Sequence, residues 1–336
     1  MEIPVVSPEP KVTLIAHHSD PIRTSAAAAI TCYSHKGASS IVFPHEPKDE
    51  RVTRTFKDCY DSGHQIFSIP SFAFGLENVS RNFVHDVLHL NLHYASDQVS
   101  QRYVTNKEAA VRMPPFNDPY STALAEKRFA AQWKAYQETI PLLESHLREI
   151  KSRSKGRLSG RDEQLVPKQS IEIARYVLPV AALSGLYHSI NLSTLYRLVL
   201  TPEITNTPWE ARLVAQKMMG EVKKVAPDAF DHIGQPLKPE DTPTYQGRKL
   251  VDTDVTAYNE KFDNNLGGFR AKLVSSTPNG DDVLADAVRT HLAASDALSD
   301  EDAVGLVMSP ATNRTLLHPI EPEHFDGASY AMGQVT

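Results

Sequence analysis

Apolar residues recur with two different periods along the chain, and these periods separate predicted strands from predicted helices. Lys11 to Ala16 (KVTLIA) is a β-branched run that ends at the polar sequence HHSDP, which predicts a strand followed by a turn. The alanine-rich stretch after it predicts a helix ending near Cys32 and Tyr33, because Ser19 or Asp20 can cap it and proline is tolerated in its first turn. The chain therefore opens as a strand, a turn and a helix.

The segments that follow alternate between irregular and periodic patterns. Residues 34–61 lack a clear period, and we expect a loop with a short helix near 52–60. Gln65 to Leu76 alternates apolar and small residues around Pro70, which predicts an edge strand or a bulged strand. Asn78 to Val104 predicts a mostly buried helix that runs into a polar turn, because apolar residues surround three histidines spaced four apart, His85, His89 and His93.

Helical periods dominate the pattern from residue 122 onward. Residues 122–151 carry aromatic and aliphatic residues three and four apart, and Pro141 should kink or split this helix. Residues 152–168 are basic and poor in apolar side chains, so we expect a mobile loop. Two further helices, the first interrupted at Pro179, and then an aperiodic linker are predicted at 170–200, 209–225 and 226–268.

A weak internal repeat affects the expected domain organisation. Ala271 to Arg289 (AKLVSSTPNGDDVLADAVR) repeats the order found near the start of the chain, which is an apolar run, a polar turn with proline and an alanine-containing helix. The identity between the two stretches is low, so chance similarity is the alternative. The repeat predicts one complete domain at 10–236, a linker at 237–269 and a partial second copy of the same fold at 270–336.

Composition narrows the classes of partner and compartment. The net charge of −6 gives no general attraction to nucleic acid or to an anionic membrane, so an anionic ligand must be held by a local group of arginines or lysines. Cys32 and Cys59 are too few for a disulfide framework and lack metal-ligand spacing. We find neither an export signal nor an apolar run of membrane-spanning length, and we expect a cytoplasmic protein.

Several short pieces of the sequence occur in the order of a known family, and together they are far more specific than any one alone. The chain resembles the flavin-dependent thymidylate synthases over residues 10–236. The pieces are KVTLIAHHSDP and AAITCYS near the start, Gly63-His64, FAFGLENVSR at 72–81, SQRYV at 100–104, EIARYVLP at 172–179, the Asn191 region, WEAR at 209–212 and DHIGQP at 231–236. The expected fold is α+β, a mixed or antiparallel sheet packed on a helical core, with oligomers formed through the helices.

The resemblance also implies a chemistry. The family methylates dUMP to dTMP reductively, with methylenetetrahydrofolate as the carbon donor and FAD, reduced by NADPH, as the source of hydride. Such a reaction needs a phosphate clamp and preorganised donors for the flavin and the pyrimidine carbonyls. The family builds each site from several subunits, so the resemblance implies a homo-oligomer, a tetramer.

The residues that the resemblance assigns fall into two groups. The substrate side consists of Ser100, Gln101, Arg102 and Arg175, of which Ser100 and the two arginines are expected on the dUMP phosphate. The cofactor side consists of His64, Asn91, Asn191 and Arg197. Arg81 is expected to support the fold rather than to contact a ligand, and no residue is assigned a catalytic role.

The cofactor side departs from the family pattern at three cationic positions. The family's Arg-His-Arg flavin motif is replaced by Leu90-Asn91-Leu92, and a one-residue gap would give His89-Leu90-Asn91 instead. Ile30 and Pro202 stand where two further arginines are expected. The activity is therefore expected to be weak or to depend on a partner unit that supplies the missing arginines.

Two other functions remain open on the sequence. The chain can be a non-catalytic homologue that binds a nucleotide or forms the structural half of an assembly. Alternatively, it can carry out an altered reaction on a related nucleotide, with the histidine face binding a metal. The first and last of the three histidines lie about 12 Å apart along a helix, too far to share one ion, and we therefore assign no metal.

Overall fold

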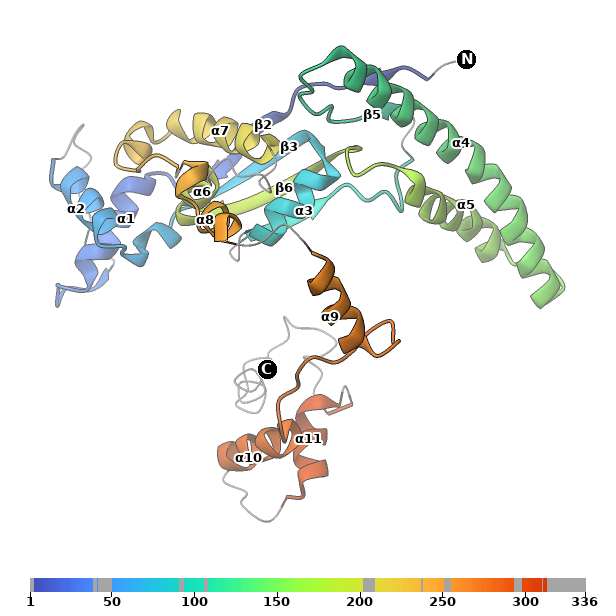
Figure 1. The fold of residues 1–336 in the computed structure, drawn as a ribbon. Coiled ribbons are helices and arrows are strands. Elements are labelled where there is room, and N and C mark those ends of the chain that lie inside the picture. The colour runs from blue at the N-terminus through green and yellow to red at the C-terminus, as the bar shows by residue number, and fades with distance from the viewer. Residues whose placement is uncertain are drawn as a thin grey trace. The chain divides into compact units, whose positions relative to one another are not determined.

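The computed structural model describes residues 3–38, 41, 50–90, 94–105, 108–201, 209–236, 238–250, 255–292, 298–309 and 311–312. The chain forms two compact units, Met1–Val251 and Asp252–Thr336 (Figure 1). None of the helices in these ranges is long and apolar enough to cross a membrane.

The first unit is built on a four-stranded sheet in which all neighbouring strands are antiparallel. Side chains alternate along the central strand, so that Phe72, Phe74 and Leu76 are buried on one face while Ser71 and Ala73 lie on the other. Each fully buried phenylalanine contributes about 1.5–3 kcal/mol to folding. The strand order is β2 (Lys11–His17), β3 (Ser71–Ser80), β6 (Leu183–Asn191) and β4 (Tyr94–Gln98).

Helices cover the apolar face of this sheet and complete the core, which confirms the predicted α+β class (Figure 1). The predicted first helix is α1, and Asp20 caps it by accepting a hydrogen bond from the backbone N–H of Arg23. An aromatic cluster joins the surrounding helices: Phe67 and Tyr196 pack against each other with tilted rings, and they meet Phe56 and Phe230 edge to face. The helices are α1 (Pro21–Thr31), α2 (Glu50–Asp61), η2 (Gln65–Ser68), α3 (Arg81–Leu90), α6 (Leu192–Leu200) and α7 (Trp209–Lys223).

The predictions around β3 and α3 need two corrections. β3 pairs on both sides, with β2 and β6, so it is a central strand and not an edge strand, although it carries the predicted bulge between Leu76 and Val79. Pro70 precedes the strand, so it removes no ladder hydrogen bond. The stretch expected to be a helix running into a turn contains α3 and then the strand β4. β4 was not predicted, and it pairs with β6 at the edge of the sheet.

A long helical hairpin replaces the predicted mobile loop. α4 (Pro119–Lys155) continues through Pro141 without splitting, and α5 (Gly160–Ala174) follows after a short turn. The turn is set by Gly156 at φ 74° and by a capping box in which Ser159 and Asp162 satisfy each other's backbone N–H groups. Lys155 also pairs with the Asp162 carboxylate at 2.9 Å. The basic composition of 152–168 therefore belongs to two helix ends, not to a loop.

The base of α4 is anchored by a smaller apolar cluster. Trp133 is fully buried against the parallel pair of β1 (Val5–Val6) and β5 (Ala109–Ala110). Val111 and Ala182 belong to the same cluster and pair with each other in an isolated antiparallel β-bridge. This cluster links α4 to the segment that enters β6.

The predicted helix at 170–200 is wrong over most of its length. α5 ends at Ala174, a short helix η3 (Arg175–Val177) follows, and β6 then occupies the centre of the sheet before α6 begins. Along β6, Leu186, His188 and Ile190 are buried while Tyr187 and Ser189 face outward. The density of leucine resembled a helix, but the burial follows the two-residue period of a strand.

Short helices occupy part of the stretch expected to be an aperiodic linker. η4 (Pro227–Phe230) packs Ala229 and Phe230 into the main core, and Tyr196 donates a hydrogen bond to the Ala229 carbonyl. η5 (Pro239–Asp241) and α8 (Pro243–Leu250) follow. For η4, packing against the main core accompanies helical structure in a stretch without a periodic sequence.

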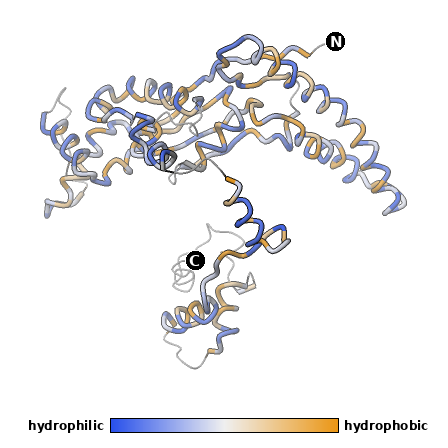
Figure 2. Tube along the Cα trace, viewed as in Figure 1, coloured by the Kyte–Doolittle hydropathy of each residue, from blue (hydrophilic) through white to orange (hydrophobic). Residues whose placement is uncertain are grey.

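The second unit contains three helices in its described part: α9 (Thr256–Leu266), α10 (Gly280–Leu292) and α11 (Asp300–Met308). α10 and α11 enclose a small core around Leu284, Val288 and Val307, and Arg289 ties them together through Asp286 and Asp300. α9 is mostly hydrophilic (Figure 2) and buries none of its side chains. Residues 271–277 form no strand, and the predicted repeat and its boundaries (10–236, 237–269 and 270–336) stay a prediction.

Candidate functional site

Three arginines gather where β4 ends and β6 begins. Arg81 opens α3, and its backbone N–H donates to the carbonyl of Ala182, one residue before β6. Its guanidinium donates to Gln98 Oε1 at 2.8 Å and to the Val99 carbonyl at 3.2 Å. Burial lowers the pKa of Arg81, and the positive charge of Arg175 lowers it further.

Arg102 belongs to the polar turn that follows β4. The carbonyl of Ser100 accepts hydrogen bonds from the backbone N–H groups of Tyr103 and Val104, and the Ser100 hydroxyl accepts one from Arg102 at 3.2 Å. This turn therefore fixes the backbone of Arg102. Its side chain pairs with Glu172, with Nε 2.7 Å from Oε1, and it lies over the Tyr103 ring.

Arg175 joins the same group from the end of α5. Its Nε donates to the backbone carbonyl of Glu172 at 3.1 Å, and its guanidinium lies over the ring of Tyr176. Arg102 and Arg175 thus both contact Glu172, although they lie more than 70 positions apart in the sequence. The structure places Ser100, Arg102 and Arg175 around Glu172, with Arg81 beside them, while their predicted contact with a nucleotide phosphate stays a prediction.

The charge balance of this arginine cluster favours an anion. Among the described residues, the Glu172 carboxylate pairs with Arg102, whereas Arg81 and Arg175 bond to neutral oxygens of Gln98, Val99 and the Glu172 backbone. Gln101, beside Arg102, has a buried amide nitrogen with no acceptor among the described residues. Arginine forks bind phosphate oxygens in pairs, so this arrangement can hold a phosphate group and offer a neutral amide donor beside it.

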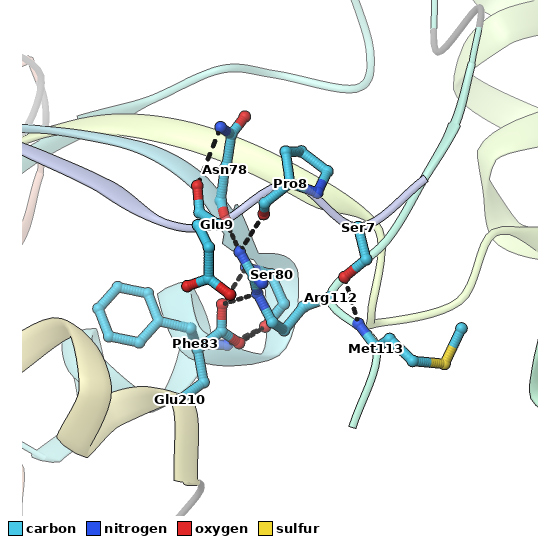
Figure 3. Close-up of polar contacts among 9 residues, drawn as sticks. All are labelled: Ser7, Pro8, Glu9, Asn78, Ser80, Phe83, Arg112, Met113 and Glu210. Carbon is cyan, nitrogen blue, oxygen red and sulfur yellow. Dashed lines mark hydrogen bonds and ion pairs between the residues drawn. The ribbon is translucent and has the colours of Figure 1, made fainter. Parts of the chain in front are cut away.

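A buried ionic network fixes the backbone next to the cluster (Figure 3). The carboxylate of Glu210 on α7 accepts hydrogen bonds from both the backbone N–H and the hydroxyl of Ser80, directly before Arg81. Arg112 lies 3.5 Å from the same carboxylate and donates to the carbonyls of Pro8 and Asn78. Burial raises the pKa of Glu210, and the Ser80 bonds and the Arg112 charge oppose that rise.

Asn191 and His64, two of the predicted cofactor-side residues, lie near the other end of β6. Asn191 caps α6, and its Oδ1 accepts hydrogen bonds from the Thr194 N–H and the Ser193 hydroxyl, both at 2.9 Å. His64 caps η2 by accepting a hydrogen bond from Ile66 N–H. Arg197 is exposed on α6, and Asn91 lies outside the described residues.

The two predicted groups are therefore separated within one chain. Arg81 is bonded to Ala182 at the start of β6, whereas Asn191 is its last residue. At about 3.3 Å per residue, these two positions lie roughly 30 Å apart. A ligand that contacts both groups must lie between copies of the chain or span the length of the sheet.

Comparison with known proteins agrees with the sequence motifs. Residues 13–228 match the model of the thymidylate synthase complementing protein family. A flavin-dependent thymidylate synthase of Clostridium tetani is 30% identical over 227 residues, which cover 67% of this chain and 86% of that protein. Another from Nitratidesulfovibrio vulgaris is also 30% identical and covers 67% and 87%. This chain belongs to the family of flavin-dependent thymidylate synthases.

One solved structure is also similar, a UMP/dUMP methylase, PolB, from Streptomyces cacaoi bound with 5-Br dUMP. It is 18% identical, with a TM-score of 0.47, and the match covers 70% of this chain and 98% of that one. The family match contains the arginine cluster and Glu210, and the second unit lies beyond it.

A shallow cavity of ≈260 Å³ lies on the open face of the sheet, toward the Asn191 end, and was not predicted. It is lined by Ala16, His17, His18, Ser71, Ala73 and Ser189. His18 Nδ1 accepts a hydrogen bond from the Ser71 N–H at 3.0 Å, and His17 Nδ1 donates to the His18 carbonyl at 2.6 Å. The histidines of the HHSDP sequence after the first strand were the signal that could have revealed it.

The described side chains of one chain do not complete a site for FAD. FAD carries a diphosphate, which calls for cationic donors, yet Asn191 is an uncharged amide, His64 accepts a hydrogen bond through Nδ1, and Arg197 is exposed. Ser68 and Ser193, which share a hydrogen bond beside Asn191, are neutral as well. Leu90-Asn91-Leu92 carries no cation in the sequence itself. Flavin binding of the family's kind therefore needs groups beyond those that the described residues bring together.

The histidine alternative is only partly covered by the structure. His85 lies on α3, whereas the side chain of His89 and the whole of His93 fall outside the described residues. Among the side chains that are described, no three from His, Cys, Asp and Glu lie close enough together to hold a metal ion.

Proposed function

We propose that this protein is a thymidylate-synthase-like enzyme of nucleotide biosynthesis that binds dUMP with its phosphate on Arg102 and Arg175. The observation that carries the proposal is the meeting of these two guanidiniums at Glu172 beside Ser100. Two arginines can offer parallel N–H pairs to the phosphate oxygens, and the Ser100 hydroxyl adds a further donor. The family relationship supports the choice of a uridine nucleotide.

Gln101 extends the proposed site toward the base. Its buried Nε2 has no acceptor among the described residues, and an unpaired buried donor costs about 1–3 kcal/mol. A carbonyl oxygen of the pyrimidine would satisfy this donor. In this proposal the Ser100 hydroxyl and the Arg102 guanidinium bind the phosphate, and the Gln101 amide between them in sequence binds the base.

The proposed reaction is the reductive methylation of dUMP to dTMP. FAD supplies the hydride when bound, NADPH reduces it, and methylenetetrahydrofolate provides the carbon. We propose that the chain forms a homo-oligomer, a tetramer, and that activity is weak or depends on a partner unit that supplies the missing arginines. His64, Asn191, Arg197 and Asn91 are the proposed cofactor-side residues. We propose a cytoplasmic location and no nucleic-acid partner.

Titration of dUMP by calorimetry tests the proposal. Arg102→Ala and Arg175→Ala should each weaken dUMP binding by about 10-fold or more, because each removes a charge-assisted contact. Arg153→Ala is the matched control, since Arg153 pairs with Glu149 on the exposed surface of α4, away from the cluster. Unchanged dUMP affinity in both cluster variants would show that the phosphate binds elsewhere.

A second candidate function is a nucleotide-binding homologue without flavin catalysis. The observation that favours it is the absence of any cation at Leu90-Asn91-Leu92, together with the separation of Asn191 from the arginine cluster. The visible spectrum of the purified protein with added FAD distinguishes the two functions. Stoichiometric flavin uptake supports the enzyme, and a colourless protein that binds dUMP supports the homologue.

A further inference from the structure

Glu172 holds both arginines of the proposed phosphate clamp, by two different groups. Its carboxylate pairs with Arg102, and its backbone carbonyl accepts from Arg175. Both contacts are made to the Nε atom of the guanidinium. A contact through Nε uses one edge of the guanidinium, so a phosphate can still bind the terminal amino groups of both arginines.

We propose that Glu172 is the positioning residue of the clamp: it pre-orients Arg102 and Arg175 so that a phosphate meets two ordered guanidiniums. This inference rests on the proposed function because it takes the arginine cluster as the phosphate site. It goes further by assigning a role to a carboxylate, a group that would ordinarily repel a phosphate.

Exposure decides what the Glu172 pair can contribute. The side chains of Arg102 and Glu172 are 49% and 35% exposed, and such pairs add little to folding stability. Ordering a long side chain before the ligand arrives, however, removes that ordering cost from the binding step. The opposing repulsion between Glu172 and the phosphate is screened by water and salt at this exposed position.

Arg81 supplies the reason that ordering is needed. Its guanidinium is held by Gln98 and Val99 and is close enough to Arg175 to affect its own ionisation. Like charges in one cluster repel each other, so an Arg175 released from Glu172 would favour solvent. The Glu172 carbonyl holds Arg175 in place against that repulsion.

The two contacts of Glu172 can be separated by mutation. Glu172→Ala removes the carboxylate and so releases Arg102, but it keeps the backbone carbonyl that holds Arg175. Glu172→Gln removes the charge and keeps an oxygen that can accept from Arg102 Nε. Glu163→Ala is the control, because Glu163 is a carboxylate on the same helix that pairs with Arg148 instead.

The experiment is a calorimetric titration of dUMP, UMP and inorganic phosphate into these variants and into Arg102→Ala and the double variant. Glu172→Ala should weaken dUMP binding by about 3- to 10-fold, which is the cost of ordering one freed side chain. Glu172→Gln and Glu163→Ala should stay within about 2-fold of the unmodified protein. In the Arg102→Ala background, Glu172→Ala should have no further effect, since its action passes through Arg102.

Three results would overturn the inference. Equal or tighter dUMP binding by Glu172→Ala would mean that the carboxylate only repels the ligand. An equal loss with and without Arg102 would mean that Glu172 acts on the fold, which thermal unfolding of each variant would also reveal. If the unmodified protein bound none of the three ligands, both this inference and the proposed function would fail. If it bound dUMP tightly and Glu172→Ala left that affinity unchanged, the inference alone would fail.

Discussion

The carboxylate of Glu210 receives two hydrogen bonds from Ser80, one from its backbone N–H at 2.8 Å and one from its hydroxyl. Ser80 is the last residue of β3, and its hydroxyl in turn accepts from the Phe83 N–H at the start of α3. Glu210 thereby fixes the junction at which Arg81 enters the arginine cluster. A carboxylate on α7 controls the position of a cation on α3.

Glu210→Ala should destabilise the protein by about 3–5 kcal/mol, because it leaves the buried Arg112 without its partner charge. Urea unfolding followed by circular dichroism measures this loss. Glu138→Ala, which breaks an exposed pair with Lys134 on α4, should change stability by no more than about 0.5 kcal/mol. A similar small change for Glu210→Ala would mean that the network does not hold the junction.

His188 makes the free energy of unfolding depend on pH. Burial lowers the pKa of His188 from 6.5 to about 4, so the folded protein binds fewer protons at this group than the unfolded chain does. The contribution of His188 is therefore complete above pH 6.5 and is lost as the pH falls toward 4. Between pH 7 and pH 5 the loss should be about 2 kcal/mol.

Urea unfolding at a series of pH values checks this dependence. His188→Gln is the comparison, because it removes the titrating ring and keeps a polar group that can reach the Ser96 hydroxyl. Other groups titrate in both proteins, so the difference between the two curves isolates His188. Parallel curves between pH 7 and pH 5 would contradict the assignment.

The turn between α4 and α5 depends on one backbone conformation. Gly156 has φ 74°, a region that side chains rarely adopt, so Gly156→Ala should destabilise the hairpin by about 1 kcal/mol. Gly220→Ala is the opposite case, since Gly220 lies within α7 with open space around its Cα. That substitution should stabilise by a similar amount. Thermal unfolding of the two variants should therefore shift in opposite directions, and a shared direction would refute the account of the turn.

Local signals were sufficient for the ends of the first unit but not for its centre. The first strand, α1 and α7 follow from caps and from periodicity within a single segment. β6 did not, because its leucines resemble a helix and only its pairing with β3 and β4 shows that Tyr187 and Ser189 face outward. α5 was also missed, because the basic composition of its first half suggested a loop although Ser159 and Asp162 form a capping box at its start.

The site shows the same division. Ser100, Arg102 and Arg175 were found through short matches to a family, and the structure brings them together. Glu172 was not singled out, because its role depends on a contact with Arg102, which lies 70 residues earlier in the chain. The distance between Arg81 and Asn191 could not be predicted while β6 was read as a helix.

The affinity ratio between dUMP and deoxyuridine tests the central claim most directly, because these two ligands differ only in the phosphate. The account predicts that the protein binds dUMP much more tightly than deoxyuridine and that Arg102→Ala, Arg175→Ala and above all their combination reduce this ratio by weakening dUMP alone. A ratio that is the same in the unmodified protein and in the double variant would contradict the claim that the arginine cluster holds the phosphate.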